Sequence, residues 1–409
     1  MSLCPARLMH YVERCLMPDV KTPELSAAKR RRSLFFLGLA VAGVGFTMAL
    51  QMGLNANFLA DDIKVSGLQI GILEGFRESC GVVAFAVLAI LAGFAEPIVG
   101  AAMLLLLGAG LAAYTFVHEF AWVVILSLVW SQGLHVWMPL PNSMALSLAE
   151  PGRAGRRLGQ ISAAGSAGWG LGLGLALALM SLGLSIRPMY LLAGAASVVA
   201  AAACLAMPRD LKTPGPRLVF RRKYGLYYLL CFLEGWRKQI FICFAGFLLV
   251  REYGTDVRTM LALWMVAQGV GYFGSPYVGR LVDRIGERRV LIAYYASIVF
   301  VFVGYAFVPN VYLLYFLFVS DSALFMLAMA TTTYVNRIAP ASEHTPTLSM
   351  GVAMNHVAAV AMPLAGGFLW KYLGYQYAFG LGAVAAALSV VAATFVPRHA
   401  PGPSSVKTA

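Results

Sequence analysis

Residues 97–117 read PIVGAAMLLLLGAGLAAYTFV, and no charged side chain interrupts these 21 positions. About 20 consecutive apolar residues are enough for an α-helix to cross the hydrocarbon core of a bilayer. A transmembrane β-strand would instead show about 10 residues of alternating polarity, and neither this stretch nor residues 195–205 alternate. The stretch therefore predicts a membrane-spanning α-helix.

Eleven more apolar stretches flank this one, so the sequence predicts an all-α polytopic membrane protein with twelve spanning helices. Of the 409 residues, 60% are hydrophobic and 12% are charged, and the mean hydropathy is +0.76. Soluble domains are about one quarter charged and disordered chains have low hydrophobicity, so the composition excludes both classes. The predicted spans cover residues 33–59, 67–92, 97–117, 121–148, 157–182, 188–206, 224–250, 258–281, 289–308, 311–338, 346–370 and 375–396.

The Lys and Arg residues of the loops indicate the orientation, because cytoplasmic loops carry an excess of both. With the N-terminus inside, 23 of the 31 Lys and Arg residues lie on the cytoplasmic side and five on the opposite side. Both termini are therefore predicted to be cytoplasmic, and the net charge of +13 indicates topology rather than nucleic-acid binding. The predicted organisation is an N-terminal tail (1–32), a six-helix bundle (33–206), a linker (207–223), a second six-helix bundle (224–397) and a C-terminal tail (398–409).

The N-terminal tail lacks the apolar core and the small-residue cleavage site of a signal peptide. It is either an unstructured tail, a surface helix, or a segment upstream of a true start at Met17. No pair of cysteines lies on the extracytoplasmic side, which predicts no disulfides, and no N-glycosylation sequon occurs. We expect a monomer in a bacterial inner (plasma) membrane, without cofactor or metal site.

The two predicted bundles align when the sequence is shifted by about 190 positions. Residues 148–151 (LAEP) then fall on residues 338–341 (IAPA), and each stretch follows a long helix with small residues and amides near its end. Parallel repeats with a solute site between them, at the bilayer midplane, are one common transporter plan. The repeat therefore favours transport through the centre of the molecule.

Residues 279–289 read GRLVDRIGERR and join the eighth predicted helix to the ninth. This stretch resembles the G-x-x-x-D-R-x-G-R-R loop of the major facilitator superfamily, and by topology the resemblance extends to all twelve helices. It implies two six-helix bundles related by a pseudo-twofold axis, with this loop as a latch for one conformation of an alternating-access cycle. The residues that match the latch are Gly279, Asp283, Arg284, Gly286, Arg288 and Arg289.

Other patterns of the family are missing. The loop at residues 93–97 (GFAEP), where the strongest copy of the latch is expected, has neither its Asp nor its Arg. The fourth helix lacks the membrane Arg of many proton-coupled members, and the fifth lacks the Gly-Pro of the antiporter motif. A fragment at residues 363–367 (PLAGG) on the eleventh helix resembles that motif instead. The glycines of the fifth helix are typical of a close-packing face.

Ten polar side chains inside the predicted spans are candidates for a substrate or proton site, because an ionisable residue at the centre of a span costs at least about 2.5–3.5 kcal/mol. The spacing i, i+3, i+4 places three of them on one face of the second helix and three on one face of the seventh. The surplus cation of the second triad is expected to bind an anionic group or to pair with Asp321. The candidates are Glu74, Arg77, Glu78, His135, Glu234, Arg237, Lys238, Asp321, Asn355 and His356.

Each triad has a second interpretation, which is a closed ion pair within one helix that only shapes the bundle. His135 and the Asn355-His356 pair have similar alternatives, as polar groups satisfied inside the bundle or as proton sites. Histidine changes its charge between about pH 5 and 8, so either histidine would serve to couple proton movement to substrate movement.

These features predict a secondary transporter that moves a small polar solute, anionic or zwitterionic, by alternating access and coupled to protons. Its expected partners are this solute, protons and membrane lipid, without nucleic acid. No nucleotide-binding, zinc-protease, nucleophile-elbow or C-x-x-C motif occurs, so no enzyme is expected. The alternatives are proton-coupled efflux of amphiphilic drugs, a sensor or scaffold that does not transport and, third, an intramembrane enzyme.

Overall fold

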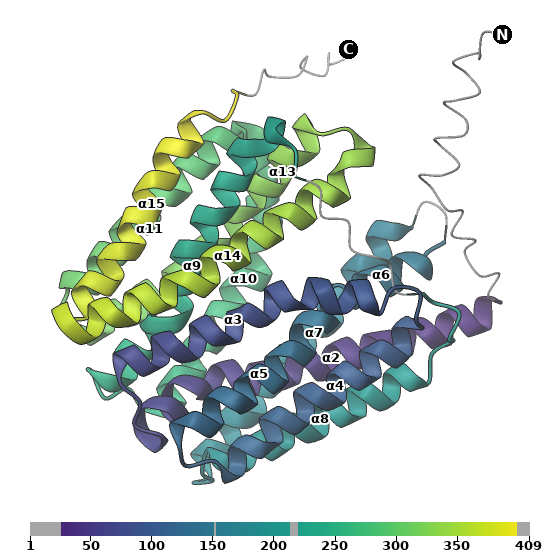
Figure 1. Ribbon diagram of the computed structural model, residues 1–409, viewed down its shortest axis with the longest axis horizontal. Coiled ribbons are helices and arrows are strands. Elements are labelled where there is room, and N and C mark those ends of the chain that lie inside the picture. Colours follow the sequence, from purple (N-terminus) through teal and green to yellow (C-terminus); the bar gives the residue numbers. More distant parts are fainter. Residues whose placement is uncertain (1–25, 151–152, 213–219, 399–409) are drawn as a thin grey trace, which may run out of the picture.

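The computed structural model describes residues 26–150, 153–212 and 220–398, and Figure 1 shows their arrangement. Within these ranges the chain is helical almost throughout, and its only β-type pairing is an isolated bridge between Ala95 and Lys212. A helix satisfies its own backbone hydrogen bonds, which a bilayer cannot do for it. The prediction of an all-α fold is therefore confirmed.

Six helical segments form the first bundle. The fourth segment is broken in two, because Pro139 and Pro141 interrupt its backbone hydrogen bonds. The segments are α2 (Ala27–Asn57) with the π-helical turn η1 (Phe58–Asp62), α3 (Gly67–Ile90), α4 (Glu96–Ala113) with η2 (Tyr114–Phe116), α5 (Phe120–Trp137) with α6 (Leu140–Ser147), α7 (Ala154–Ser181) and α8 (Arg187–Leu205).

Six more segments form the second bundle, which follows the short 3-10 turn η3 (Arg222–Tyr224). They are α9 (Gly225–Arg251), α10 (Val257–Ile285), α11 (Glu287–Phe307), α12 (Val311–Leu324) with η4 (Phe325–Ala328) and α13 (Met329–Ile338), α14 (Ala341–Leu373) and α15 (Tyr375–Thr394). The described helices thus reproduce the twelve predicted spans with shifts of a few residues at their ends. The chain is an integral membrane protein of two six-helix bundles.

Nine of the described segments are apolar enough to cross a membrane by length and composition alone. The other three long helices are α3, α9 and α10. Each of α3 and α9 carries three ionisable residues near its middle, at residues 74–78 and 234–238. Two of the helices that look least like membrane spans, α3 and α9, therefore carry six of the ten candidate residues.

The N-terminal helix starts earlier than the sequence predicts. Ser26 caps α2 by accepting a hydrogen bond from the Lys29 amide, so the basic residues 29–32 extend the helix and are not part of a tail. Residues 1–25, with Cys4 and Cys15, lie outside the described residues, as do residues 213–219 of the linker. The other four cysteines, Cys80, Cys204, Cys231 and Cys243, are free thiols.

The two bundles touch along α3 and α14, which lie side by side over part of their lengths (Figure 1). Glycines make this contact a backbone-to-backbone one. A Cβ atom added to Gly71 would overlap the Pro363 carbonyl and the Gly367 backbone, and one added to Gly67 would overlap the Trp370 ring. We call this contact, from Gly67 to Gly75 on α3 and from Val360 to Trp370 on α14, the seam.

The bundles are in contact at one end and separate towards the other. At the end of α2, the Asn57 side-chain amide donates to the Thr255 carbonyl at 3.0 Å, and Leu261 of α10 lies against Gly53 of α2. Towards the other end, α3 and α14 diverge (Figure 1), and a groove opens between α2, α5, α6 and α7, with Gln268 of α10 at its edge. The sequence-predicted orientation makes the closed end extracytoplasmic.

Candidate functional site

A narrow cavity of about 30 Å³ lies between the bundles near their closed end. One side is polar and comes from α2 and α3, which contribute Asn55, Glu74 and Arg77. The opposite side is aromatic and comes from α9, α10 and α12, which contribute Phe241, Phe247, Trp264 and Phe318. A cavity of this size holds water but no organic solute, so a solute can enter only after the bundles move apart.

The charged face of α3 is a closed network around Arg77. Its Nη1 donates to Glu74 Oε1 at 2.7 Å and its Nη2 to Glu78 Oε1 at 3.2 Å, while Nη2 also contacts Glu74 Oε2. The Arg77 guanidinium lies 5.5 Å from the Trp130 ring centroid, and Ser131 Oγ donates to the Arg77 carbonyl. All three charged side chains are buried, yet Glu74 and Arg77 still reach the cavity.

The charged residues of α9 form a different network. Arg237 is 0% exposed; its Nε and Nη2 donate to Glu234 Oε1 at 3.1 and 2.6 Å. Its Nη1 donates to both Asp321 oxygens at 3.1 and 3.2 Å, and its Nη2 also donates to the Tyr294 hydroxyl. That hydroxyl in turn donates to Glu234 Oε1 at 3.0 Å. Arg237 therefore has two carboxylates as partners and lies inside the second bundle, away from the cavity wall.

Lys238 and its neighbour Gln239 bind partners in different bundles. Lys238 Nζ donates to Asn355 Oδ1 of α14 at 3.1 Å, and no carboxylate within salt-bridge distance of it is recorded among the described residues. Gln239 Nε2 donates to Glu74 Oε2 at 3.3 Å, which joins α9 to α3 across the interface. The structure thus brings six of the ten candidates into two charged networks and pairs Lys238 with Asn355.

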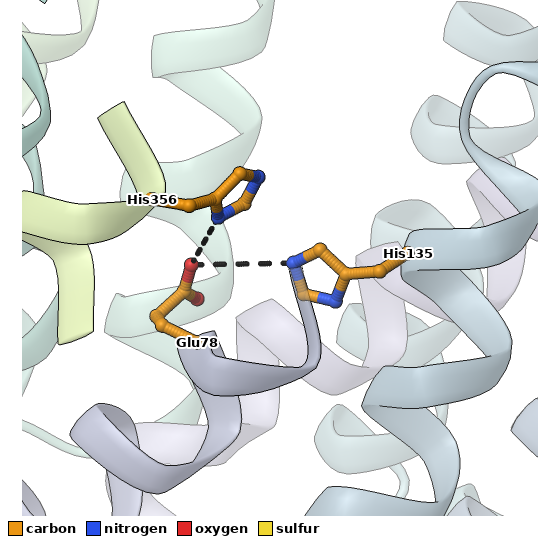
Figure 2. Close-up of side chains that lie close together, drawn as sticks. All are labelled: Glu78, His135 and His356. Carbon is orange, nitrogen blue, oxygen red and sulfur yellow. Dashed lines mark ion pairs between the residues drawn. The ribbon is translucent and has the colours of Figure 1, made fainter. Parts of the chain in front are cut away.

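The third group of candidates is the cluster of Glu78, His135 and His356, which Figure 2 shows pointing towards one another. Glu78 Oε2 lies 3.4 Å from His356 Nδ1 and 4.0 Å from His135 Nε2. The imidazole rings are 5.1 Å apart in an edge-to-face arrangement. Because Glu78 and His135 come from the first bundle and His356 from the second, the cluster bridges the interface.

Two residues of these networks are not among the candidates that the sequence predicts. Tyr294 completes the Arg237 network, but a tyrosine on an apolar helix is indistinguishable from a packing residue in the sequence. Gln239 joins the two bundles, and as an amide in the middle of a span it is detectable by the same criterion that selects Asn355.

The predicted latch residues lie at the junction of α10 and α11. Gly286 separates the helices with φ of 81°, a conformation that glycine adopts without steric strain. Gly279 lies in the last turns of α10, and Asp283 is exposed. The arginines of the motif, Arg284, Arg288 and Arg289, line a surface hollow together with Arg398. Their role as a latch stays a prediction.

Outside the membrane, Glu343 at the start of α14 is held by the end of the linker. Lys223 Nζ lies 2.7 Å from Glu343 Oε2, and the Tyr224 hydroxyl donates to the same oxygen at 2.6 Å. The hydrogen bond from Lys223 is the largest influence, and it holds the pKa of the Glu343 carboxyl below its ordinary value.

A lowered carboxyl pKa stabilises the fold above the ordinary pKa, and this stabilisation is lost as the pH falls through the lowered value. Glu343→Gln is therefore expected to lower Tm slightly near neutral pH, and the difference from the wild type should vanish in acid. Thermal unfolding in detergent across this pH range measures it, with Glu252→Gln as an exposed control. A difference that persists in acid would contradict the assignment.

Residues 227–409, which comprise nearly all of the second bundle, match the family model of the Major Facilitator Superfamily. A solved point mutant of the nucleoside transporter NupG has a TM-score of 0.74 at 14% identity, over 88% of this chain and 99% of that one. The second half of the chain thus matches this family in sequence, and the chain as a whole has the fold of this solved transporter. A bacterial homologue of the human lysosomal transporter Spinster, solved in its inward-facing, unoccupied conformation, has a TM-score of 0.71 at 13% identity, over 92% of this chain and 100% of that one. No protein of curated function matches the sequence.

In this chain the cavity and the histidine cluster lie between the bundles, and the α3 network reaches the cavity, whereas the Arg237 network lies inside the second bundle. The structural neighbours share the fold at low identity, so they do not identify the solute. The class of solute must therefore be inferred from the residues that line the cavity.

Proposed function

We propose that the chain is a secondary transporter that moves a small polar organic solute, zwitterionic or anionic, by alternating access. The observation that carries this proposal is the cavity between the bundles, which has Glu74, Arg77 and Asn55 on one side and aromatic rings on the other. A carboxylate or phosphate of the solute would bind Arg77, because a guanidinium presents paired donors to such groups.

The remaining walls suit the rest of such a solute. An ammonium group would bind Glu74, whose Oε2 contacts Arg77 and accepts a hydrogen bond from Gln239. The flat rings of Phe241, Trp264 and Phe318 would pack against the apolar part. A site with one cation, one anion and an aromatic wall favours a zwitterion over a simple inorganic ion.

The way the bundles meet supports alternating access. One end is closed by the seam and by the Asn57–Thr255 hydrogen bond. In the predicted orientation this end is extracytoplasmic, and the arrangement then faces the cytoplasm. Movement of one bundle against the other about a midplane site exposes the site to each side in turn.

Proton coupling would use the Arg237 network. It holds two carboxylates against one guanidinium, and the buried Glu234 Oε2 has no hydrogen-bond partner among the described residues. A surplus negative charge in a dry interior is costly, and binding of one proton removes it. Arg237 and Asp321 lie one helical turn from Phe241 and Phe318 of the cavity wall, so solute binding and protonation would influence each other.

The test is a thermal-shift screen of purified protein with anions, zwitterions and lipophilic cations, followed by uptake into proteoliposomes. A ligand at a hundredfold excess over its Kd stabilises the folded state by about 2.7 kcal/mol. A shift with one anionic or zwitterionic class should disappear in Arg77→Lys, which keeps the charge but loses the paired donors, and should remain in the exposed control Arg251→Lys. Shifts with lipophilic cations alone would support drug efflux instead.

A further inference from the structure

We propose that Glu78, His135 and His356 form a binding site for one divalent transition-metal ion of the Zn²⁺ class, shared between the two bundles. The ligating atoms all lie within 4.8 Å of one another, and Figure 2 shows them converging on one point. Two imidazoles and a carboxylate are a donor set that Zn²⁺ accepts with a fourth position left open. The sequence alone predicts no metal site, because its ligands come from three different helices.

The hydrogen bonds of His135 orient it as a ligand. Its Nδ1 lies 2.9 Å from the Ser131 carbonyl, which can only accept, so Nδ1 carries the proton. The lone pair of Nε2 then points towards Glu78 Oε2, another acceptor, at 4.0 Å. A histidine that donates its other ring nitrogen to a backbone carbonyl is the usual arrangement around a bound metal.

His356 supplies an independent observation. Its Nδ1 is buried and has no hydrogen-bond partner among the described residues, although Glu78 Oε2 is 3.4 Å away. Gly81, one turn after Glu78, makes room for this ring, since a Cβ atom at that position would overlap it. The second bundle therefore inserts into a space that α3 leaves open an imidazole whose buried Nδ1 has the Glu78 carboxylate as its close neighbour.

The charge around the cluster indicates the fourth ligand. Arg77 holds Glu78 Oε1, which leaves Oε2 for the ion. Glu74 and Glu78 balance Arg77 and Lys238, so a divalent cation would add two uncompensated positive charges to a buried site. An anion at the open position would offset part of this charge, and a carboxylate of the proposed solute or a hydroxide has the required chemistry.

Ligand–ligand separations around tetrahedral zinc are about 3.3 Å for bonds of about 2.0–2.1 Å, so the side chains must close in by roughly an ångström. Such a contraction would pull α14 against α3 and α5. Since one ligand belongs to the second bundle, a bound ion would hold the bundles in the present arrangement. Metal binding itself does not depend on transport. The restriction of bundle movement by the bound ion, which we call the clamp, rests on the proposed function.

The test is equilibrium binding of Zn²⁺ to the full-length protein in detergent, with Co²⁺ as a spectroscopic probe. We expect one ion per chain and the visible bands of four-coordinate Co²⁺. His135→Gln and His356→Gln should each weaken binding at least tenfold and abolish these bands. His118→Gln and His344→Gln, which change histidines outside the cluster, should do neither. Absence of binding, or binding that survives both cluster variants, would overturn the site.

The clamp has its own readout, which is uptake into proteoliposomes with and without Zn²⁺. Zn²⁺ should inhibit the wild type and leave His356→Gln unaffected. Stoichiometric binding without inhibition would overturn the clamp and keep the site. Intact binding in a protein that transports no solute would count against the proposed function alone.

Discussion

Replacing Arg237 with leucine is expected to lower the free energy of unfolding by about 3–5 kcal/mol, because it leaves Glu234 and Asp321 buried without their shared cation. Few single substitutions are this damaging. Thermal or denaturant unfolding of the detergent-purified protein measures the effect, and low yield of folded protein would accompany it.

A compensated variant separates lost charge balance from lost shape. Arg237→Met combined with Glu234→Gln and Asp321→Asn removes the cation and both anions together. Neutralising a whole buried ion network is often close to neutral for stability, so this triple variant should regain most of the loss. If the triple variant is as unstable as Arg237→Leu, packing rather than charge dominates at this position.

Replacing Gly71 with valine is expected to open the seam, because its Cβ would overlap the Pro363 carbonyl and the Gly367 backbone. Overpacking of a tight contact costs about 1–3 kcal/mol, and the cost falls only on the conformation in which the seam is closed. The equilibrium between conformations should therefore shift about 5–150-fold towards the opposite one.

Spin labels on the exposed residues Lys64 and Glu252, one on each bundle at the closed end, would report this shift as a longer distance population. Gly170→Val is the matched control, since a Cβ atom on Gly170 meets no neighbour. An unchanged distance distribution in Gly71→Val would show that the seam yields locally, without movement of the bundles.

The spans could be predicted closely because a bilayer imposes length and apolarity on each of them, and those quantities are readable residue by residue. The start of α2 could not be predicted, because residues 29–32 are basic and only the Ser26 cap shows that they are helical. Helical spacing likewise placed Glu74, Arg77 and Glu78 on one face.

The sequence could not show which face of each helix contacts which neighbouring helix. Arg237 and Arg77 have the same local pattern, a glutamate three residues before the arginine. Arg77 nevertheless reaches the cavity and Arg237 lies inside its own bundle, because the rotation of α3 and α9 depends on their neighbours. The convergence of Glu78, His135 and His356 depends on three helices at once, so no local pattern announces it.

The seam has a consequence for the speed of the conformational cycle. Glycines, main-chain atoms and the apolar side chains of Leu364 and Trp370 form it, so its parting breaks few specific polar interactions. The hydrogen bonds that cross between described residues include those from Asn57 to Thr255, from Gln239 to Glu74 and from the Cys243 thiol to the Ile70 carbonyl, and water can replace each of them as the bundles separate. The activation barrier for rocking would then depend more on the charged groups beside the interface than on the contact itself, and ligands that alter those charges would control the rate.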